Sequence, residues 1–182
     1  KILKKYAYRH RKNTKLYINE QNSGGVFYQW KKGLELAKGE LIWIAESDDW
    51  CDRKFLEELV NCFRNQSVMM AFGKTVFMKN GQQTWSINGY LKMLKYDFNK
   101  AFSETAYNAV NNGFGYRNII PNVSSALFRN TGFKSIINNR DWYKLKICGD
   151  WMLYLDTIKG GKIAYRPNSI NYFRRSEEHT SE

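Results

Sequence analysis

Apolar residues recur every three or four positions in several parts of the chain, which is the spacing that gathers them on one face of a helix. This spacing predicts helices at 2–7, 26–38, 52–63, 103–112 and 149–158. Between them lie apolar runs of strand length, at 15–18, 41–45, 68–72, 75–78, 123–128, 162–165 and 169–173. Because strands and helices alternate, the pattern predicts an α/β protein with a mostly parallel sheet flanked by helices.

An acidic cluster follows one of these strands. The run Leu41–Ala45 contains no polar residue, which predicts a strand buried on both faces. Glu46, Asp48 and Asp49 come directly after it, and Asp52 is positioned to cap the next helix. Ligands of open α/β sheets bind at the carboxyl ends of strands, and Mg²⁺ and Mn²⁺ prefer oxygen ligands. The cluster therefore indicates a divalent-cation site, although a solvated acidic turn explains the same residues.

The composition is that of one folded domain. The chain has 182 residues, and 43% of them are hydrophobic, which is enough to bury a core. Its apolar runs are far shorter than the roughly 20 residues of a membrane-spanning helix. Cys51, Cys62 and Cys148 form no CxxC pair. This argues against a disulfide scaffold or a structural zinc site and favours the reducing cytoplasm.

The formal net charge is +12, from 29 Lys and Arg against 17 Asp and Glu, so the protein attracts anions. Nucleic acid, acidic lipid and a nucleotide diphosphate all qualify. Basic and aromatic residues interleave at 1–15 and 90–96, a pattern that suits single-stranded nucleic acid. In that alternative, a nucleic-acid-binding module, the acidic cluster would repel the phosphate chain.

Both ends depart from the pattern of a complete domain. The chain begins at Lys1 within a helical pattern, and the acidic end Ser176–Glu182 differs sharply from the basic, aromatic residues before it. That end resembles the translation of a sequencing adapter. We therefore interpret 1–175 as an incomplete domain and 176–182 as a non-native tail, an interpretation that a natural transcript encoding the same final residues would refute.

Four motifs in a fixed order carry a more specific signal. They lie at 22–33 with 37–49, at 122–129, at 148–155, and at 161–165 with 171–174. In this order they resemble the inverting glycosyltransferases of family 2, which have the GT-A fold. The resemblance implies a donor half, an acceptor-side strand, a helix that carries the general base, and closing strands. It also implies that the family's first βαβ strands are missing here, so that this chain alone would bind a nucleotide sugar poorly.

The resemblance assigns donor binding to Glu46, Asp48, Asp49, Gly24 and Gly25. Glu46 and Asp48 occupy the place of the family's DxD motif, so both are expected to bind a divalent cation, Mn²⁺ or Mg²⁺, with the diphosphate. Glu46 departs from the usual Asp and is one methylene longer. Gly24 and Gly25 would offer backbone N–H groups to a phosphate, although a simple turn needs the same residues.

On the acceptor side, Asp150 matches the family's catalytic base, and Asn122, Ser124 and Trp151 are expected to contact the acceptor. A base is needed because the attacking hydroxyl must lose its proton, and a carboxylate within hydrogen-bond reach can take it. Without the resemblance, Asp150 is a helix N-cap and Trp151 a core residue.

The activity that the resemblance implies is metal-assisted, inverting transfer of a hexose or similar sugar from a nucleotide-diphosphate donor to a glycan or lipid-linked acceptor. Such enzymes serve bacterial cell-surface polysaccharide or glycan synthesis. The protein would be cytoplasmic, with peripheral contact at the inner face of the membrane that its charge favours, and no nucleic-acid partner is expected. A GT-A domain that has lost catalysis and acts as a scaffold is a further alternative.

Overall fold

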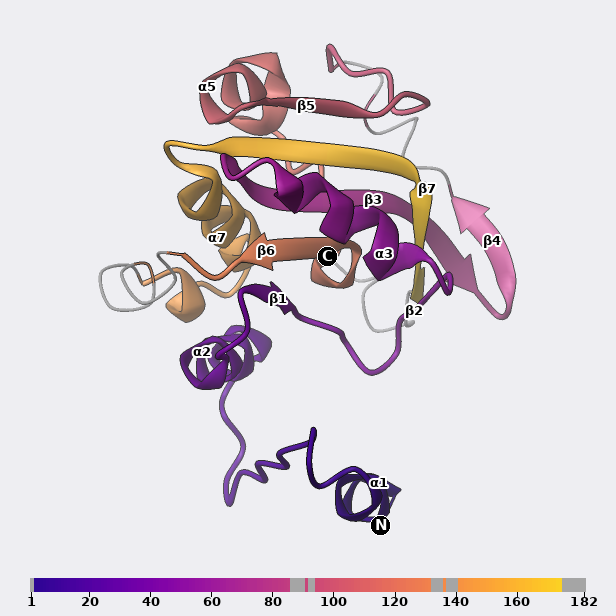
Figure 1. The fold of residues 1–182 in the computed structure, drawn as a ribbon, viewed down its shortest axis with the longest axis vertical. Coiled ribbons are helices and arrows are strands. Elements are labelled where there is room, and N and C mark those ends of the chain that lie inside the picture. Colours follow the sequence, from indigo (N-terminus) through magenta and orange to yellow (C-terminus); the bar gives the residue numbers. More distant parts are fainter. Residues whose placement is uncertain (1, 86–90, 92–93, 132–135, 137–140, 175–182) are drawn as a thin grey trace.

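The computed structural model describes residues 2–85, 91, 94–131, 136 and 141–174. Within these residues, seven strands form one sheet (Figure 1). They are β1 (Leu41–Trp43), β2 (Trp50–Cys51), β3 (Val68–Lys79), β4 (Gln82–Trp85), β5 (Phe102–Thr105), β6 (Ala126–Arg129) and β7 (Lys162–Arg174). Their order is β1-β6-β3-β7-β2, with β4 paired to β3 and β5 to β7. The predicted tail at 176–182 lies outside the described residues.

Helices flank the sheet, as predicted for an α/β protein. They are α1 (Ile2–Arg9), α2 (Val26–Leu36), α3 (Phe55–Val60), α5 (Ala106–Ala109) and α7 (Gly149–Ile158). Shorter helical turns lie at Asn61–Arg64, Val110–Phe114, Val123–Ser125 and Trp142–Lys144. Figure 1 shows α1 apart from the sheet, and none of its residues is buried. In the described part of the chain, no helix has the length and apolarity that crossing a membrane requires.

The two faces of the sheet build two separate cores. In β6, Ala126 and Phe128 pack on the side of α7, where the Phe128 ring stacks on Tyr154 with centroids 5.9 Å apart. Leu127, between them, packs on the opposite side against Leu59 of α3 and its neighbours. Successive residues of a strand point to opposite faces, so a strand covered on both sides needs apolar residues throughout. This explains the continuous apolar runs in the sequence.

β3 and β7 are each one long strand, where the sequence predicted two short ones. They run side by side in parallel, and the register jumps from Gly73 opposite Arg166 to Lys74 opposite Ile170. A side chain at Gly73 would place its Cβ 2.1 Å from the backbone oxygen of Ser169. The absence of a Cβ therefore lets the two strands approach at the irregularity without separating.

The prediction of a mostly parallel sheet is wrong. Among the described strand pairs, only β3 with β7 is parallel. β1 and β3 do run in the same direction, but β6 lies between them and is antiparallel to both. Hydrophobic runs report burial and carry no information on direction, so the insertion of β6 was invisible in the pattern.

Three predicted elements differ locally. Residues 15–18 form no strand, because no described strand pairs with them. The helix predicted at 103–112 begins at Ala106, after β5, where the Thr105 hydroxyl accepts a hydrogen bond from the Asn108 N–H. α3 begins at Phe55 without a side-chain cap, and the Asp52 carboxylate instead accepts a hydrogen bond from the Tyr172 hydroxyl.

Candidate active site

The acidic loop, residues 46–49, connects β1 to β2 and is held by the turn that precedes β6. Because β6 pairs with β1, the turn at Val123–Ser125 lies beside the end of β1. The Glu46 N–H donates to the Ser124 hydroxyl oxygen at 3.0 Å, and the Trp43 indole N–H donates to the Ser124 carbonyl at 2.8 Å. Ser124 is buried, so the start of the loop is fixed to a rigid part of the sheet.

Asp49 is anchored at the other end of the acidic loop. The Asn122 Nδ2 donates to Asp49 Oδ2 at 2.7 Å, and the Arg174 backbone N–H donates to Asp49 Oδ1 at 3.3 Å. Asn122 is buried and also donates to Asn171 Oδ1, while it accepts from the Thr75 hydroxyl. Asp49 is thus tied to β3 and β7 through one amide.

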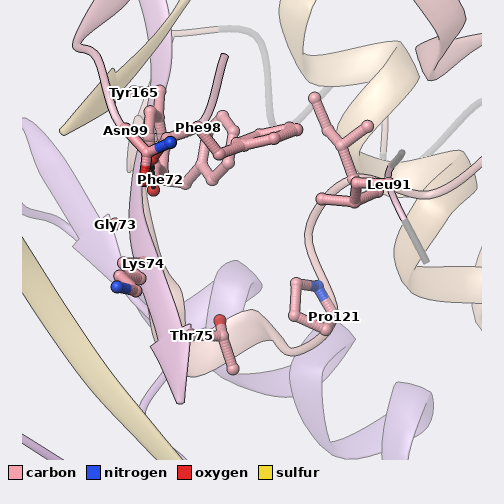
Figure 2. A pocket seen from close by; sticks show the side chains of 10 residues that line it. Phe72, Gly73, Lys74, Thr75, Leu91, Phe98, Asn99, Pro121 and Tyr165 are labelled. Atoms are coloured by element: carbon pink, nitrogen blue, oxygen red, sulfur yellow. Dashed lines mark hydrogen bonds between the residues drawn. The ribbon is translucent and has the colours of Figure 1, made fainter. Parts of the chain in front are cut away.

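A small pocket lies beside Thr75, the residue whose hydroxyl donates to Asn122 (Figure 2). Thr75 and Pro121 border it on one side, and the rings of Phe72, Phe98 and Tyr165 on another. Its volume of about 20 Å³ suffices for about one water molecule and is far too small for a sugar. The pocket is therefore no candidate for a sugar-binding site.

The carboxylates of the loop crowd one another. The pKa of Glu46 is raised to about 7, mostly by burial and then by the negative charges of Asp49, Asp48 and Asp150, while a hydrogen bond from the Trp30 indole opposes the shift. Burial also raises the pKa of Asp49, against hydrogen bonds from Ser124 and Asn122 that lower it. A site that raises carboxylate pKa values in this way favours a bound proton or a bound cation.

Asp150 is the second residue of α7 and is half-buried. The position before the helix belongs to Cys148, which has a positive φ of 60° and makes no side-chain cap. Burial raises the pKa of Asp150, while hydrogen bonds from the Trp151 backbone and the Asn118 side chain lower it. The Asn118 Nδ2 lies 3.0 Å from Asp150 Oδ2. Asp150 is therefore a restrained carboxylate and not the N-cap residue of the helix.

The acidic loop and Asp150 lie within electrostatic reach of each other, although they come from elements about a hundred residues apart. The charge of Asp150 raises the pKa of Glu46, and both carboxylates raise the pKa of Tyr154, which is fully buried on α7. Carboxylates that influence one another in this way share one region of the molecule. The acidic loop and Asp150 thus lie near each other in the structure.

The remaining predicted residues have these positions. Gly24, with a φ of 85°, and Gly25 are exposed just before α2. Asn122 and Ser124 are buried, and both hold the acidic loop. Trp151 is half-buried, and its indole N–H donates to the Phe114 carbonyl at 2.9 Å.

The donor set fits a cation that is shared with a substrate. In the described ranges, no three His, Cys, Asp or Glu side chains are grouped so that they could hold a metal ion. Glu46 and Asp48 offer two carboxylates, and Mg²⁺ is usually bound by one or two carboxylates together with substrate phosphates and water. A cation there would also relieve the repulsion that raises the pKa of Glu46.

Sequence reasoning missed two residues of the site. Asn118 lies in the stretch 80–121, whose pattern is irregular apart from the helix predicted at 103–112, and nothing in the sequence marked it. Trp30 fits the apolar stripe of α2 and is indeed buried, but its indole N–H also reaches Glu46. A buried indole usually finds a hydrogen-bond partner, and this is the signal that could have been followed.

Comparison with known proteins shows the family and the fold. The sequence pattern of Glycosyl transferase family 2 matches residues 1–124. The chain belongs to this family. Three crystal structures of TarS from S. aureus share its fold: TarS 1–349 in complex with UDP-GlcNAc has 19% identity and a TM-score of 0.66. TarS 1–349 in complex with UDP has 20% identity and a TM-score of 0.68, and TarS has 18% and 0.68.

The family-2 chain corresponds to a part of these structures. The match covers 97% of it and 46% and 48% of the two TarS 1–349 chains, and 96% of it and 29% of TarS. The chain therefore spans about half the length of TarS 1–349 and less than a third of the longer TarS chain. No curated protein sequence matches it.

Proposed function

We propose that the protein transfers a sugar from a nucleotide-diphosphate donor to an acceptor hydroxyl, with inversion at the anomeric carbon. The observation that carries the proposal is the pairing of an acidic loop, at the carboxyl end of a strand, with Asp150 from a distant helix. Membership in family 2 and the likeness to TarS crystallised with UDP-GlcNAc support a nucleotide sugar as donor.

On the donor side, Asp48 and Glu46 would hold Mn²⁺ or Mg²⁺ against the diphosphate. When bound, the cation supplies positive charge that stabilises the leaving diphosphate as a Lewis acid. Asp49 keeps the loop in place through Asn122 and Arg174. Gly24 and Gly25 would offer backbone N–H groups to the donor from the start of α2.

On the acceptor side, Asp150 takes the proton of the attacking hydroxyl. The hydroxyl oxygen forms a bond to the anomeric carbon while the bond from that carbon to the diphosphate oxygen breaks, and the electron pair leaves with the diphosphate. Attack from the opposite face inverts the configuration. Burial of Asp150 raises its pKa and so makes it a stronger base, an effect that general-base catalysis uses. Trp151, next to the base, would border the acceptor.

The acceptor class that best fits is a glycan or a lipid-linked glycan of the cell surface. A net charge of +12 favours peripheral contact with an anionic membrane surface, where lipid-linked acceptors are found. We therefore propose that the activity serves polysaccharide or glycan synthesis at the cytoplasmic face of a membrane.

The test uses the protein at its full natural length and a panel of UDP-, GDP- and dTDP-sugars with glycan acceptors. Release of nucleoside diphosphate is measured with MnCl₂ and with EDTA, for the natural protein and for Asp150→Asn. We expect turnover with one donor, its loss in Asp150→Asn, and retained donor binding in that variant. Asp97→Asn is the matched control, because Asp97 is exposed and, among the described residues, its carboxylate contacts Asn99 and Lys100 of its own turn. Full turnover by Asp150→Asn would contradict the proposal.

The same assay, with Asp48→Ala as a further variant, separates the two alternatives. A scaffold without catalysis would bind the donor and show no turnover in any form. A nucleic-acid-binding module would bind a single-stranded oligonucleotide in a salt-dependent manner, and Asp48→Ala would leave that binding unchanged.

A further inference from the structure

One segment of the chain contacts both acidic parts of the site. This bridging segment, residues 114–124, begins at the last residue of the helical turn Val110–Phe114 and ends within the turn before β6. At its start, the Phe114 carbonyl accepts the indole N–H of Trp151. At its end, Ser124 and Asn122 hold the acidic loop. Between these ends, Asn118 contacts Asp150.

The Asn118 amide has a defined orientation. Its Oδ1 accepts the backbone N–H of Ile120 at 3.0 Å, which leaves the Nδ2 group facing Asp150 Oδ2 at 3.0 Å. The direction of an amide is read from such a network, because only one orientation satisfies both partners. Ile119 and Ile120 are completely buried, so the backbone that carries Asn118 is anchored in the core.

We propose that Asn118 is a positioning residue, which fixes the direction in which the Asp150 carboxylate points toward the acceptor. The proposal rests on the function proposed above, in which Asp150 is the base. The carboxylate sits on the first turn of α7, where the Trp151 backbone N–H also donates to it, so its own helix supplies one restraint. Asn118 adds a donor from a core-anchored loop, and this second restraint limits the side-chain torsions from another direction.

The expected effect of losing Asn118 follows from the geometry of proton transfer. Displacing a catalytic base by about 1 Å can lower the rate of the chemical step about 10²-fold, even when the substituted residue does not touch the substrate. Donor binding depends on the acidic loop, which Ser124 and Asn122 hold. The loss should therefore fall on kcat and leave the donor KM nearly unchanged.

Two variants separate positioning from folding of the loop. Asn118→Asp has the same shape and keeps an oxygen for the Ile120 N–H, but it presents an acceptor where Asp150 needs a donor. Asn118→Ala introduces no charge and removes both bonds. Asn130→Ala is the matched control. Asn130 makes a similar bond, from Nδ2 to the Gly39 carbonyl at 2.7 Å, but it directly follows β6 and so lies at the opposite end of that strand from Ser124.

The experiment measures kcat and the donor KM for these variants, with the donor and acceptor found in the nucleotide-sugar screen. We expect kcat to fall about 10- to 100-fold in both Asn118 variants, with the donor KM within twofold and Asn130→Ala like the natural protein. A kcat within threefold of the natural value in either folded variant, or a loss confined to the donor KM, overturns the positioning role. Turnover in Asp150→Asn overturns the proposed function instead, so the two failures are distinct.

Discussion

Asn122 on the turn before β6 donates a hydrogen bond of 2.7 Å to the Asp49 carboxylate at the end of the acidic loop. The amide is buried, and its other bonds go to Asn171 and Thr75 in the sheet. One side chain therefore joins the loop to β3 and β7. Removing it leaves several polar groups without partners in a region that water reaches poorly.

Asn122→Leu should lower the free energy of unfolding by about 1–3 kcal/mol, because a buried polar group without a partner carries that penalty. Urea denaturation measures the change. Asn99→Leu is the control, since Asn99 is exposed and, in the described part of the chain, its side chain bonds to Asp97 of its own turn. Equal stability of the two variants would show that the Asn122 network contributes nothing.

Glu46 should make stability depend on pH. Its folded pKa of about 7 lies above the ordinary 4.5. The unfolded chain therefore releases this proton first, and the free energy of unfolding should fall as pH rises from about 4.5 to about 7, by at most about 3 kcal/mol. Below pH 4.5 Glu46 is protonated in both states and causes no loss of stability. Above about pH 7 it is ionised in both states, and the loss of stability is complete and constant.

Glu46→Gln carries no such penalty. Urea denaturation is measured at pH 5 and at pH 7.5. At pH 5 the natural protein and the variant should have similar free energies of unfolding. At the higher pH, the variant should be more stable. Exposed Glu20 supplies the control, and Glu20→Gln should follow the natural protein at both values. A constant difference between Glu46→Gln and the natural protein would show that Glu46 does not titrate in this window.

A divalent cation together with UDP should raise the melting temperature of the full-length protein. At a concentration 100 times the dissociation constant, binding stabilises a folded protein by about 2.7 kcal/mol. Asp48→Asn should lose this shift, while Asp97→Asn should keep it. The shift should also be smaller at pH 5.5 than at pH 8, because Glu46 then holds a proton where the cation would bind. Thermal melts with MnCl₂ and UDP decide the matter, and an unchanged shift in Asp48→Asn would exclude Asp48 as a ligand.

Two glycines should respond to alanine in opposite directions. Gly73→Ala would drive a Cβ to 2.1 Å from the Ser169 backbone oxygen, so β3 and β7 must separate, at about 1–3 kcal/mol or more. Gly33 lies within α2 with nothing within 4 Å of its Cβ position, and Gly33→Ala should stabilise by about 0.5–1 kcal/mol. If both variants shift the denaturation midpoint in the same direction, the close approach of β3 and β7 at Gly73 does not limit stability.

The sequence predicted those elements whose pattern is local. α2 and α7 begin where expected, at Val26 and Gly149, because each places its apolar residues on one face and starts after a clear break. The acidic loop lies directly beyond β1, because a buried strand followed by carboxylates is a local signal. The family was recognisable for the same reason.

What the sequence could not give depends on contacts between distant residues. Gly73 and the irregular stretch before Ile170 looked like breaks, yet each lies inside a continuous strand, because the partner strand bends with it. The direction of β6 depends on the path of the preceding segment, which has no periodicity. Asn118 became visible only when Asp150 was placed beside it.

The bridging segment has an evolutionary consequence. Asn118 contacts Asp150, and Asn122 contacts Asp49 of the acidic loop. Adding or deleting one residue between Asn118 and Asn122 would therefore change the distance between these two contacts. Substitutions that keep the attachment points would leave that spacing intact. Homologues should therefore vary in composition along this stretch far more readily than in length.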